Sequence, residues 1–71
     1  MIITEDDKKR VIAIAQYLRN SEESTRGAPV LEKYWYYKSS IIYYISNGLS
    51  LETSKEMTKT MVKELNENLI V

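Results

Sequence analysis

The clearest pattern along the chain is a helical alternation of apolar and polar residues after residue 50. At about 100° per residue, one side of this segment is apolar and consists of Leu51, Met57, Met61, Val62, Leu65 and Leu69. Ser54 and Thr58 lie on the same side and would allow a neighbouring helix to approach closely. Ser50 precedes the segment and is a favourable N-cap, because its hydroxyl can accept a free backbone N–H. The pattern predicts a helix over about 51–68.

A second helical stripe lies near the start of the chain and consists of Val11, Ile14, Ala15 and Leu18. Thr4 can cap this segment. The acidic run 5–7 follows it in the first turn, where the helix dipole favours negative charge. We therefore predict a helix over about 5–19.

The stretch 20–28 has no apolar period and is rich in small polar residues, which predicts a polar loop. The alternative is a longer first helix that continues through Ser24, because Glu22 and Arg26 have the i,i+4 spacing of a helical ion pair.

The middle segment is delimited by Pro29 and Gly48. Proline is favoured in the first turn of a helix, and glycine is favoured just after the last turn, so a helix over about 29–47 is expected. The short connection that follows makes it a neighbour of the 51–68 helix. Residues 1–71 are thus predicted to form one all-α, three-helix domain with the aromatic helix in the centre.

This central helix has an apolar arc of about half its circumference, whereas a surface helix needs a stripe of only about 100°. The arc consists of Val30, Leu31, Tyr34, Trp35, Tyr37, Ile41, Ile42, Tyr44 and Ile45. Such a width predicts contact with two partners at once. The other two helices of the same chain are the simplest partners, and a second copy is the alternative.

Tyr36, Tyr43 and Lys38 do not fit this division. The two tyrosines fall on the polar half, beside Lys33 and Asn47, where they can be isolated exposed rings, an interface stripe or a base-stacking surface. Lys38 falls inside the apolar arc. It can extend to water over the ring of Trp35 or Tyr34, or it can meet an acidic group of a partner. Lys33, Tyr36, Lys38, Tyr43 and Asn47 are the predicted partner-binding residues.

The composition disfavours an enzyme. The chain has no histidine and no cysteine, which removes the commonest general base, metal ligand and thiol nucleophile. It also has no glycine-rich phosphate loop. The acidic run 5–7 is typical of a helix start, with a hard-cation site as the minor alternative. No catalytic residue, metal or cofactor is expected.

Ten Lys and Arg balance ten Asp and Glu. This balance disfavours nucleic-acid binding, which usually needs a basic excess, and it favours self-association. We expect a homodimer through part of the central helix or through the apolar end Leu69, Ile70 and Val71. The chain shows no signal-peptide pattern and no apolar run of transmembrane length, so a cytoplasmic protein without membrane contact is expected. The abundance of Lys, Asn, Ile and Tyr is typical of AT-rich genomes and favours an origin in a phage or mobile element.

The stretch 41–65 resembles the outline of a helix-turn-helix motif, with a helix, a turn glycine and a capped second helix. The resemblance implies a DNA-binding role in which the 51–68 helix presents Thr53, Ser54, Lys55 and Lys59 to a groove. Tyr44 and Ser54 stand where the motif usually has a small and an apolar residue.

The leading hypothesis is a small non-enzymatic protein-interaction module, acting as a regulator, inhibitor or assembly factor that covers a partner surface. DNA binding through the 51–68 helix is the alternative.

Overall fold

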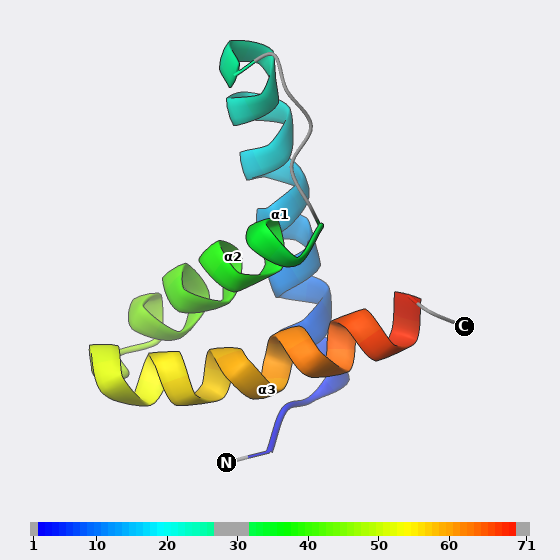
Figure 1. Cartoon of the computed structure of the whole chain (residues 1–71). Helices are drawn as coiled ribbons and strands as arrows, with labels where there is room; N and C mark the ends of the chain where they lie inside the picture. Colours follow the sequence, from blue (N-terminus) through cyan, green and yellow to red (C-terminus); the bar gives the residue numbers. More distant parts are fainter. Residues whose placement is uncertain (1, 27–31, 70–71) are drawn as a thin grey trace.

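Three α-helices form the protein in a computed structural model that describes residues 2–26 and 32–69. They are α1 (Glu5–Arg26), α2 (Glu32–Ser46) and α3 (Leu51–Leu69). Helices α2 and α3 pack beside each other, and α1 crosses them steeply and extends beyond them (Figure 1). The predicted all-α, three-helix fold is confirmed. None of these helices carries an apolar stretch of membrane-spanning length within the described residues.

The molecule is thin, with extents of 36 × 29 × 18 Å. Packed helix axes lie about 8–10 Å apart, so the thinnest direction holds about two helix layers. No helix can be surrounded on all sides in such a shape. Each helix therefore keeps a face toward solvent.

The start of α1 follows the prediction. The backbone N–H of Asp7 donates to Thr4 Oγ1 at 3.0 Å, and the backbone N–H of Thr4 donates to Asp7 Oδ2 at 3.0 Å. This reciprocal pair has the arrangement of a capping box, with Asp at the position usually held by Glu. Lys8 Nζ lies 3.7 Å from Glu64 Oε1 and connects this end of α1 to α3.

The predicted loop over 20–28 is wrong for residues 20–26, which continue α1 to Arg26. The alternative of a longer first helix is confirmed, and the helix extends past Ser24. Glu22 in this extension forms an ion pair with Lys38 of α2, with 2.5 Å between Oε1 and Nζ. The pair gives the last turns a tertiary contact that the local polar composition did not indicate. Residues 27 and 28 lie outside the described part of the chain.

The turn between α2 and α3 follows the prediction closely. Gly48 has φ +92°, a conformation that glycine adopts without strain. Its N–H donates to the Ile45 carbonyl at 3.0 Å, and the Leu49 N–H donates to the Tyr44 carbonyl at 3.1 Å, which together make a Schellman motif. The Ser50 hydroxyl accepts the Thr53 N–H at 3.2 Å and caps α3. The predicted start of α2 at Pro29 lies outside the described residues.

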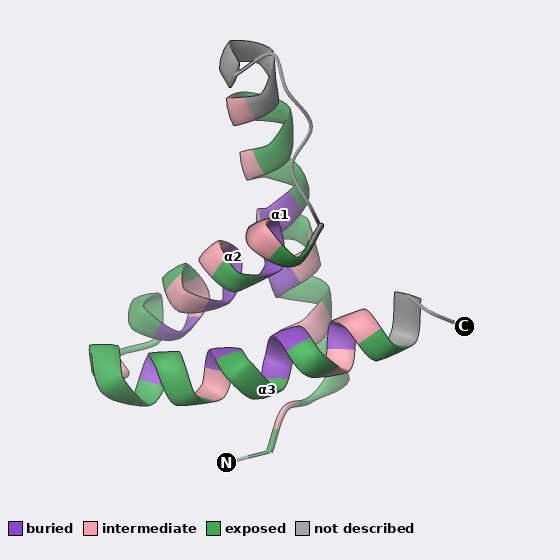
Figure 2. Ribbon diagram, viewed as in Figure 1, coloured by how far each residue is buried: buried purple, intermediate pink, exposed green. Residues whose placement is uncertain are grey.

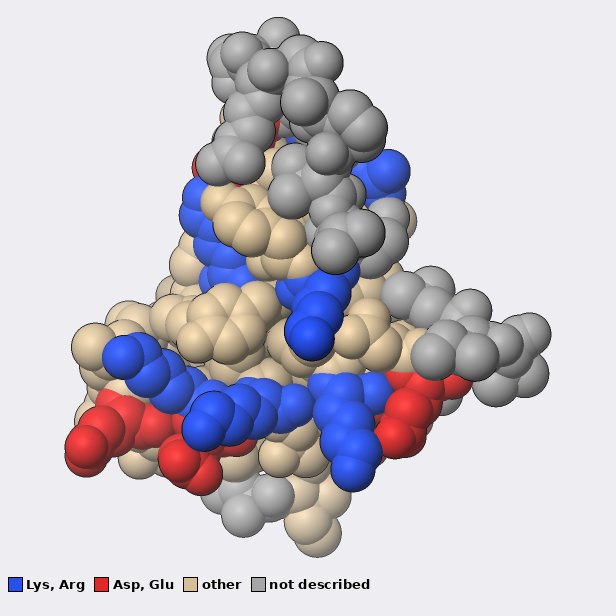
Figure 3. Space-filling model, in the orientation of Figure 1, with Lys and Arg blue, Asp and Glu red and all other residues tan. Residues whose placement is uncertain are grey.

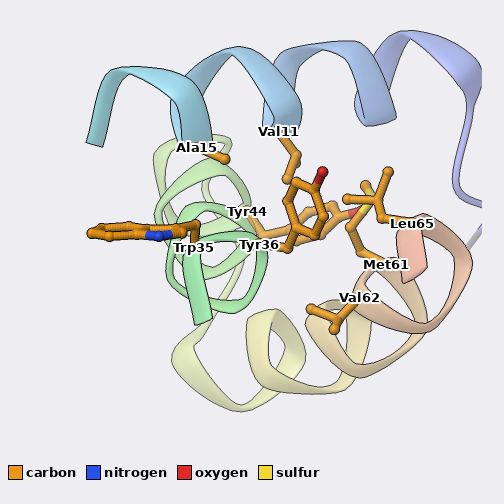
Figure 4. Packing of buried hydrophobic residues seen from close by; sticks show 8 residues of the cluster. All are labelled: Val11, Ala15, Trp35, Tyr36, Tyr44, Met61, Val62 and Leu65. Atoms are coloured by element: carbon orange, nitrogen blue, oxygen red, sulfur yellow. The ribbon is translucent and has the colours of Figure 1, made fainter. Parts of the chain in front are cut away.

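The core lies where the three helices meet, and α2 is its centre (Figure 4). Its buried apolar side chains come from all three helices and are Val11, Ala15, Trp35, Tyr36, Tyr44, Met61, Val62 and Leu65. Four small polar side chains are also fully buried, namely Ser39, Ser40, Ser54 and Thr58. The small size of the last two fits the predicted close approach to α3. Leu51, predicted to belong to the apolar side of α3, is instead 54% exposed.

Helix α2 is rotated relative to the orientation expected from its sequence. Tyr37, Ile42 and Ile45 were predicted to lie in the core, but they are 43%, 39% and 45% exposed. Tyr36, predicted to lie on the polar half, is only 7% exposed, and Ser39 and Ser40 are completely buried. Figure 2 shows the buried positions of α2 on its inner side and exposed positions on its outer side.

The physical reason is that α2 has apolar residues on both sides. The inner side combines large rings with small serines, so the helices can approach closely while the rings fill the remaining space. Ser40 satisfies its hydroxyl locally by donating to the Tyr36 carbonyl at 2.7 Å. The outer side carries branched isoleucines, which no other described part of the chain covers completely.

Candidate functional site

Three of the six exposed large apolar side chains among the described residues lie on α2. We define the apolar face of α2 as Tyr37, Ile41, Ile42 and Ile45. Ile41 is half-buried, and the other three are exposed. Isolated exposed apolar residues are ordinary, but a contiguous group on one helix is typical of an interaction surface.

Lys38 lies between Ile42 and Ile45 on the helix surface, within the apolar face, and has a partner within the chain. Its Nζ bonds Glu22 Oε1 and lies 5.9 Å from the centre of the Tyr34 ring. The predicted cation–π contact with Tyr34 is therefore present. An acidic group does meet the lysine, but that group belongs to α1.

Tyr43 connects α2 to the start of α1. Its hydroxyl donates to Asp7 Oδ1 at 2.6 Å. This bond stabilises the carboxylate and the neutral phenol, so it lowers the pKa of Asp7 and raises the pKa of Tyr43. The side-chain amide of Asn47 donates to the Tyr43 carbonyl at 2.8 Å. Tyr43 thus joins α2 to the start of α1, and Asn47 stabilises the end of α2.

The predicted partner-binding residues do not form one surface. Tyr36 is buried in the core, so the expectation that it faces outward beside Tyr43 is wrong. Tyr43 is half-buried against α1, while Lys33 and Asn47 are exposed. Among the five, only Lys33 lines the groove described next.

A groove of about 430 Å³ runs between α2 and α3. We define the lysine-rimmed groove by the residues that line it, namely Lys33, Tyr37, Lys59, Val62, Lys63, Asn66 and Glu67. A second hollow shares Tyr37 and Lys59 with it and extends along α3 past Lys55, Glu52 and Glu56. Figure 3 shows basic side chains lined up along this boundary, with acidic side chains at both ends. Tyr37 joins the groove to the apolar face of α2.

The sequence pattern held a signal for this groove. Lys55, Lys59 and Lys63 recur at i,i+4 spacing and therefore follow one edge of α3. The balanced net charge concealed this local concentration of positive charge.

The predicted DNA-contacting residues are only partly accessible. Ser54 is completely buried, so its expected exposure toward a nucleic acid is wrong. Thr53 is exposed, but its hydroxyl accepts from Ser50 Oγ at 3.0 Å as part of the helix cap. Lys55 and Lys59 are exposed.

The predicted self-association segment, Leu69 to Val71, begins at the last residue of α3. Helix α3 ends at Leu69, and nothing is described of that side chain. Ile70 and Val71 lie outside the described residues.

In the ranges 2–26 and 32–69, no three acidic side chains converge on a metal-sized site. The serine and threonine hydroxyls that are buried lie within the core, away from the groove lining. The accessible features of the described residues include the apolar face of α2, the lysine-rimmed groove and a smaller hollow of about 180 Å³ lined in part by Tyr43 and Asn47.

Comparison with known proteins gives no match to a protein-family model, a curated protein or a solved structure.

Proposed function

We propose that this protein is a non-enzymatic interaction module that regulates or assembles a partner protein by covering part of its surface. The observation that carries the proposal is the orientation of α2, which buries Ser39 and Ser40 and exposes Ile42 and Ile45. A helix that serves only its own core is expected to bury its isoleucines first.

The energetics support a binding role for the apolar face of α2. Complete burial of an isoleucine is worth about 1.5–3 kcal/mol. Because Ile42 and Ile45 are already more than half covered, each can contribute roughly 1 kcal/mol more. Association costs about 4–15 kcal/mol in lost freedom of movement. The apolar face therefore needs a neighbouring contact region, and the lysine-rimmed groove adjoins it through Tyr37.

The proposal can be tested by site-specific photo-cross-linking in the cells that naturally make the protein. Benzoylphenylalanine placed at Ile42 samples the apolar face, and the same residue placed at Tyr17 is the matched control. Tyr17 lies on α1 and is 73% exposed, so it samples an exposed position away from α2. The expected result is one discrete cross-linked product from position 42, with a mass different from that of two joined copies of 8.3 kDa, and none from position 17.

The proposal fails if position 42 gives no discrete product, or if both positions give the same product. In the first case the apolar face contacts only solvent. In the second case the cross-linking reports general exposure.

DNA binding is the second candidate function, and the row Lys55, Lys59 and Lys63 is the observation in its favour. Without Ser54, the row offers phosphate contacts rather than base contacts, which would give binding with little sequence preference. A gel shift with random duplex at low salt tests this candidate. Absence of retardation at micromolar protein would exclude it.

A further inference from the structure

We propose that the lysine-rimmed groove binds an acidic amphipathic helix of a partner protein. This inference rests on the proposed function, which makes the partner a protein, and it adds the chemistry of the segment that is bound.

The groove keeps an excess of positive charge, because three lysines and one glutamate line it. Lys33, Lys59 and Lys63 form no ion pair there. Lys59 and Lys63 are one helical turn apart, and like charges at this spacing destabilise a helix by about 0.2–0.5 kcal/mol per pair. Carboxylates of a ligand would remove this repulsion and form charge-assisted hydrogen bonds.

The groove also offers apolar contacts. Val62 is almost completely buried at its base, and the ring of Tyr37 is partly exposed beside it. Because Val62 is already buried, the apolar surface that a ligand can cover here belongs mainly to Tyr37, and each Å² that is buried is worth about 25 cal/mol. The preferred ligand therefore combines a central apolar residue with acidic neighbours.

A helix matches the spacing of the basic row. Consecutive lysines on α3 are four residues apart, which is about 6 Å along the axis at 1.5 Å per residue. A partner helix with Asp or Glu at i and i+4 repeats this distance. Its apolar side chain then lies between the two carboxylates and faces Val62.

The acidic residues at the ends of the groove favour a short peptide segment over a nucleic acid. Glu52 and Glu56 lie at one end, and Glu67 lies at the other. A phosphate backbone carries negative charge along its whole length, so it would be repelled by the glutamates at both ends of the groove. A peptide can place its acidic residues in the middle and neutral or basic residues at its ends.

The test is fluorescence anisotropy with the full chain and a labelled synthetic helix of about four turns. The peptide has glutamates at i and i+4 around one leucine, and a version with glutamine at both positions is the control ligand. We expect binding of the glutamate peptide that weakens with added salt, and little binding of the glutamine peptide.

The protein variants are Lys63→Glu in the groove and Lys9→Glu as the matched control. Lys9 is an exposed lysine of α1 outside the groove, so both variants change the charge equally. Lys63→Glu is expected to weaken binding by about tenfold or more, and Lys9→Glu by less than about twofold. Circular dichroism checks that both variants are folded, and Lys59→Gln is a second groove variant.

Three results would overturn the inference: no binding of the glutamate peptide, equal loss in both charge variants, or tighter binding of a single-stranded oligonucleotide of similar length. The last result would assign the groove to nucleic acid. The variant Ile42→Ser separates this inference from the proposed function. Ile42→Ser should retain peptide binding, because Ile42 does not line the groove. Peptide binding can therefore be present even if cross-linking from position 42 fails and the proposed function is wrong.

Discussion

Tyr44 combines a buried ring with a hydroxyl that has no hydrogen-bond partner among the described residues. Burial raises its pKa from 10.0 to about 12, with a smaller contribution from the negative charge of Asp7. The pKa is higher in the folded than in the unfolded chain, so folding favours the neutral phenol. The associated stabilisation is complete below pH 10 and is lost as the pH rises toward about 12.

The variant Tyr44→Phe tests this assignment through urea unfolding at pH 7 and above pH 10. At pH 7 the variant should be as stable as wild type or more stable by up to about 1 kcal/mol, because a buried hydroxyl without a partner is removed. Above pH 10 the variant should lose less stability than wild type. A variant that is clearly less stable at pH 7 would show that the hydroxyl makes a stabilising bond.

Tyr43→Phe is the matched comparison, because it removes a hydroxyl that has a partner. Loss of the bond to Asp7 should cost about 1 kcal/mol at neutral pH. It should also reduce the loss of stability on acidification, since the pKa of Asp7 is lowered by that bond. The stabilisation from Asp7 is present above its unfolded pKa of 3.8 and is lost as the pH falls through its folded value.

At the scale of the helix, the turn between α2 and α3 gives a prediction for Gly48→Ala. A Cβ at this position would meet nothing within 4 Å, so the cost arises from the positive φ alone. We expect about 1 kcal/mol of destabilisation, with a smaller loss for Gly48→Asn, because asparagine tolerates this region better. Thermal unfolding of the two variants measures the difference, and a loss several times larger would indicate a rearranged turn.

The extension of α1 gives a second prediction at this scale. The ion pair of Glu22 with Lys38 is partly exposed, with side-chain exposures of 29% and 38%, so it contributes little to global stability, at most about 1 kcal/mol. Its effect should be local, because it holds the last turns of α1 against α2. In Glu22→Ala, amide hydrogens over 20–26 should exchange faster than in wild type, while those over 8–15 stay unchanged. Equal protection in both proteins would mean that other contacts hold the extension.

The helix boundaries were predictable where local chemistry decides them. Thr4, Ser50 and Gly48 act through their own hydroxyls or backbone conformation, and the structure places all three as predicted. The rotation of α2 was not predictable from periodicity, because Tyr36 on one side competes with Ile45 on the opposite side. Close packing around the buried serines decides between them, and packing depends on the shape of neighbouring helices. The extension of α1 was predicted only as an alternative for a similar reason, since Lys38, which pairs with Glu22, lies far away in sequence.

At the scale of the whole molecule, the groove shows how a neutral chain can hold a charged site. The net charge of zero describes the molecule as a whole. It does not say where on the surface the lysines gather. Lys33 comes from α2 and Lys63 from α3, and only the packing of these helices brings them to one groove. The spacing of the lysines within α3 could be read from the sequence. That Lys33 of α2 lines the same groove could be known only from the orientation of α2.

The thin shape and the neutral charge lead to the last prediction, which is that the isolated protein forms a homodimer through the apolar face of α2 when no partner protein covers that face. Two copies related by a two-fold axis would place Ile42 and Ile45 of each chain against the same residues of the other. No net charge opposes this approach, and the lysines of the groove lie to one side. Sedimentation equilibrium should give a mass approaching twice 8.3 kDa at high concentration for wild type and for Tyr17→Asp. Ile45→Asp should remain a monomer, because pairing would bury a carboxylate without a partner. A wild-type mass of 8.3 kDa at every concentration would leave the apolar face free for a different protein, and dimers of Ile45→Asp would place the contact elsewhere.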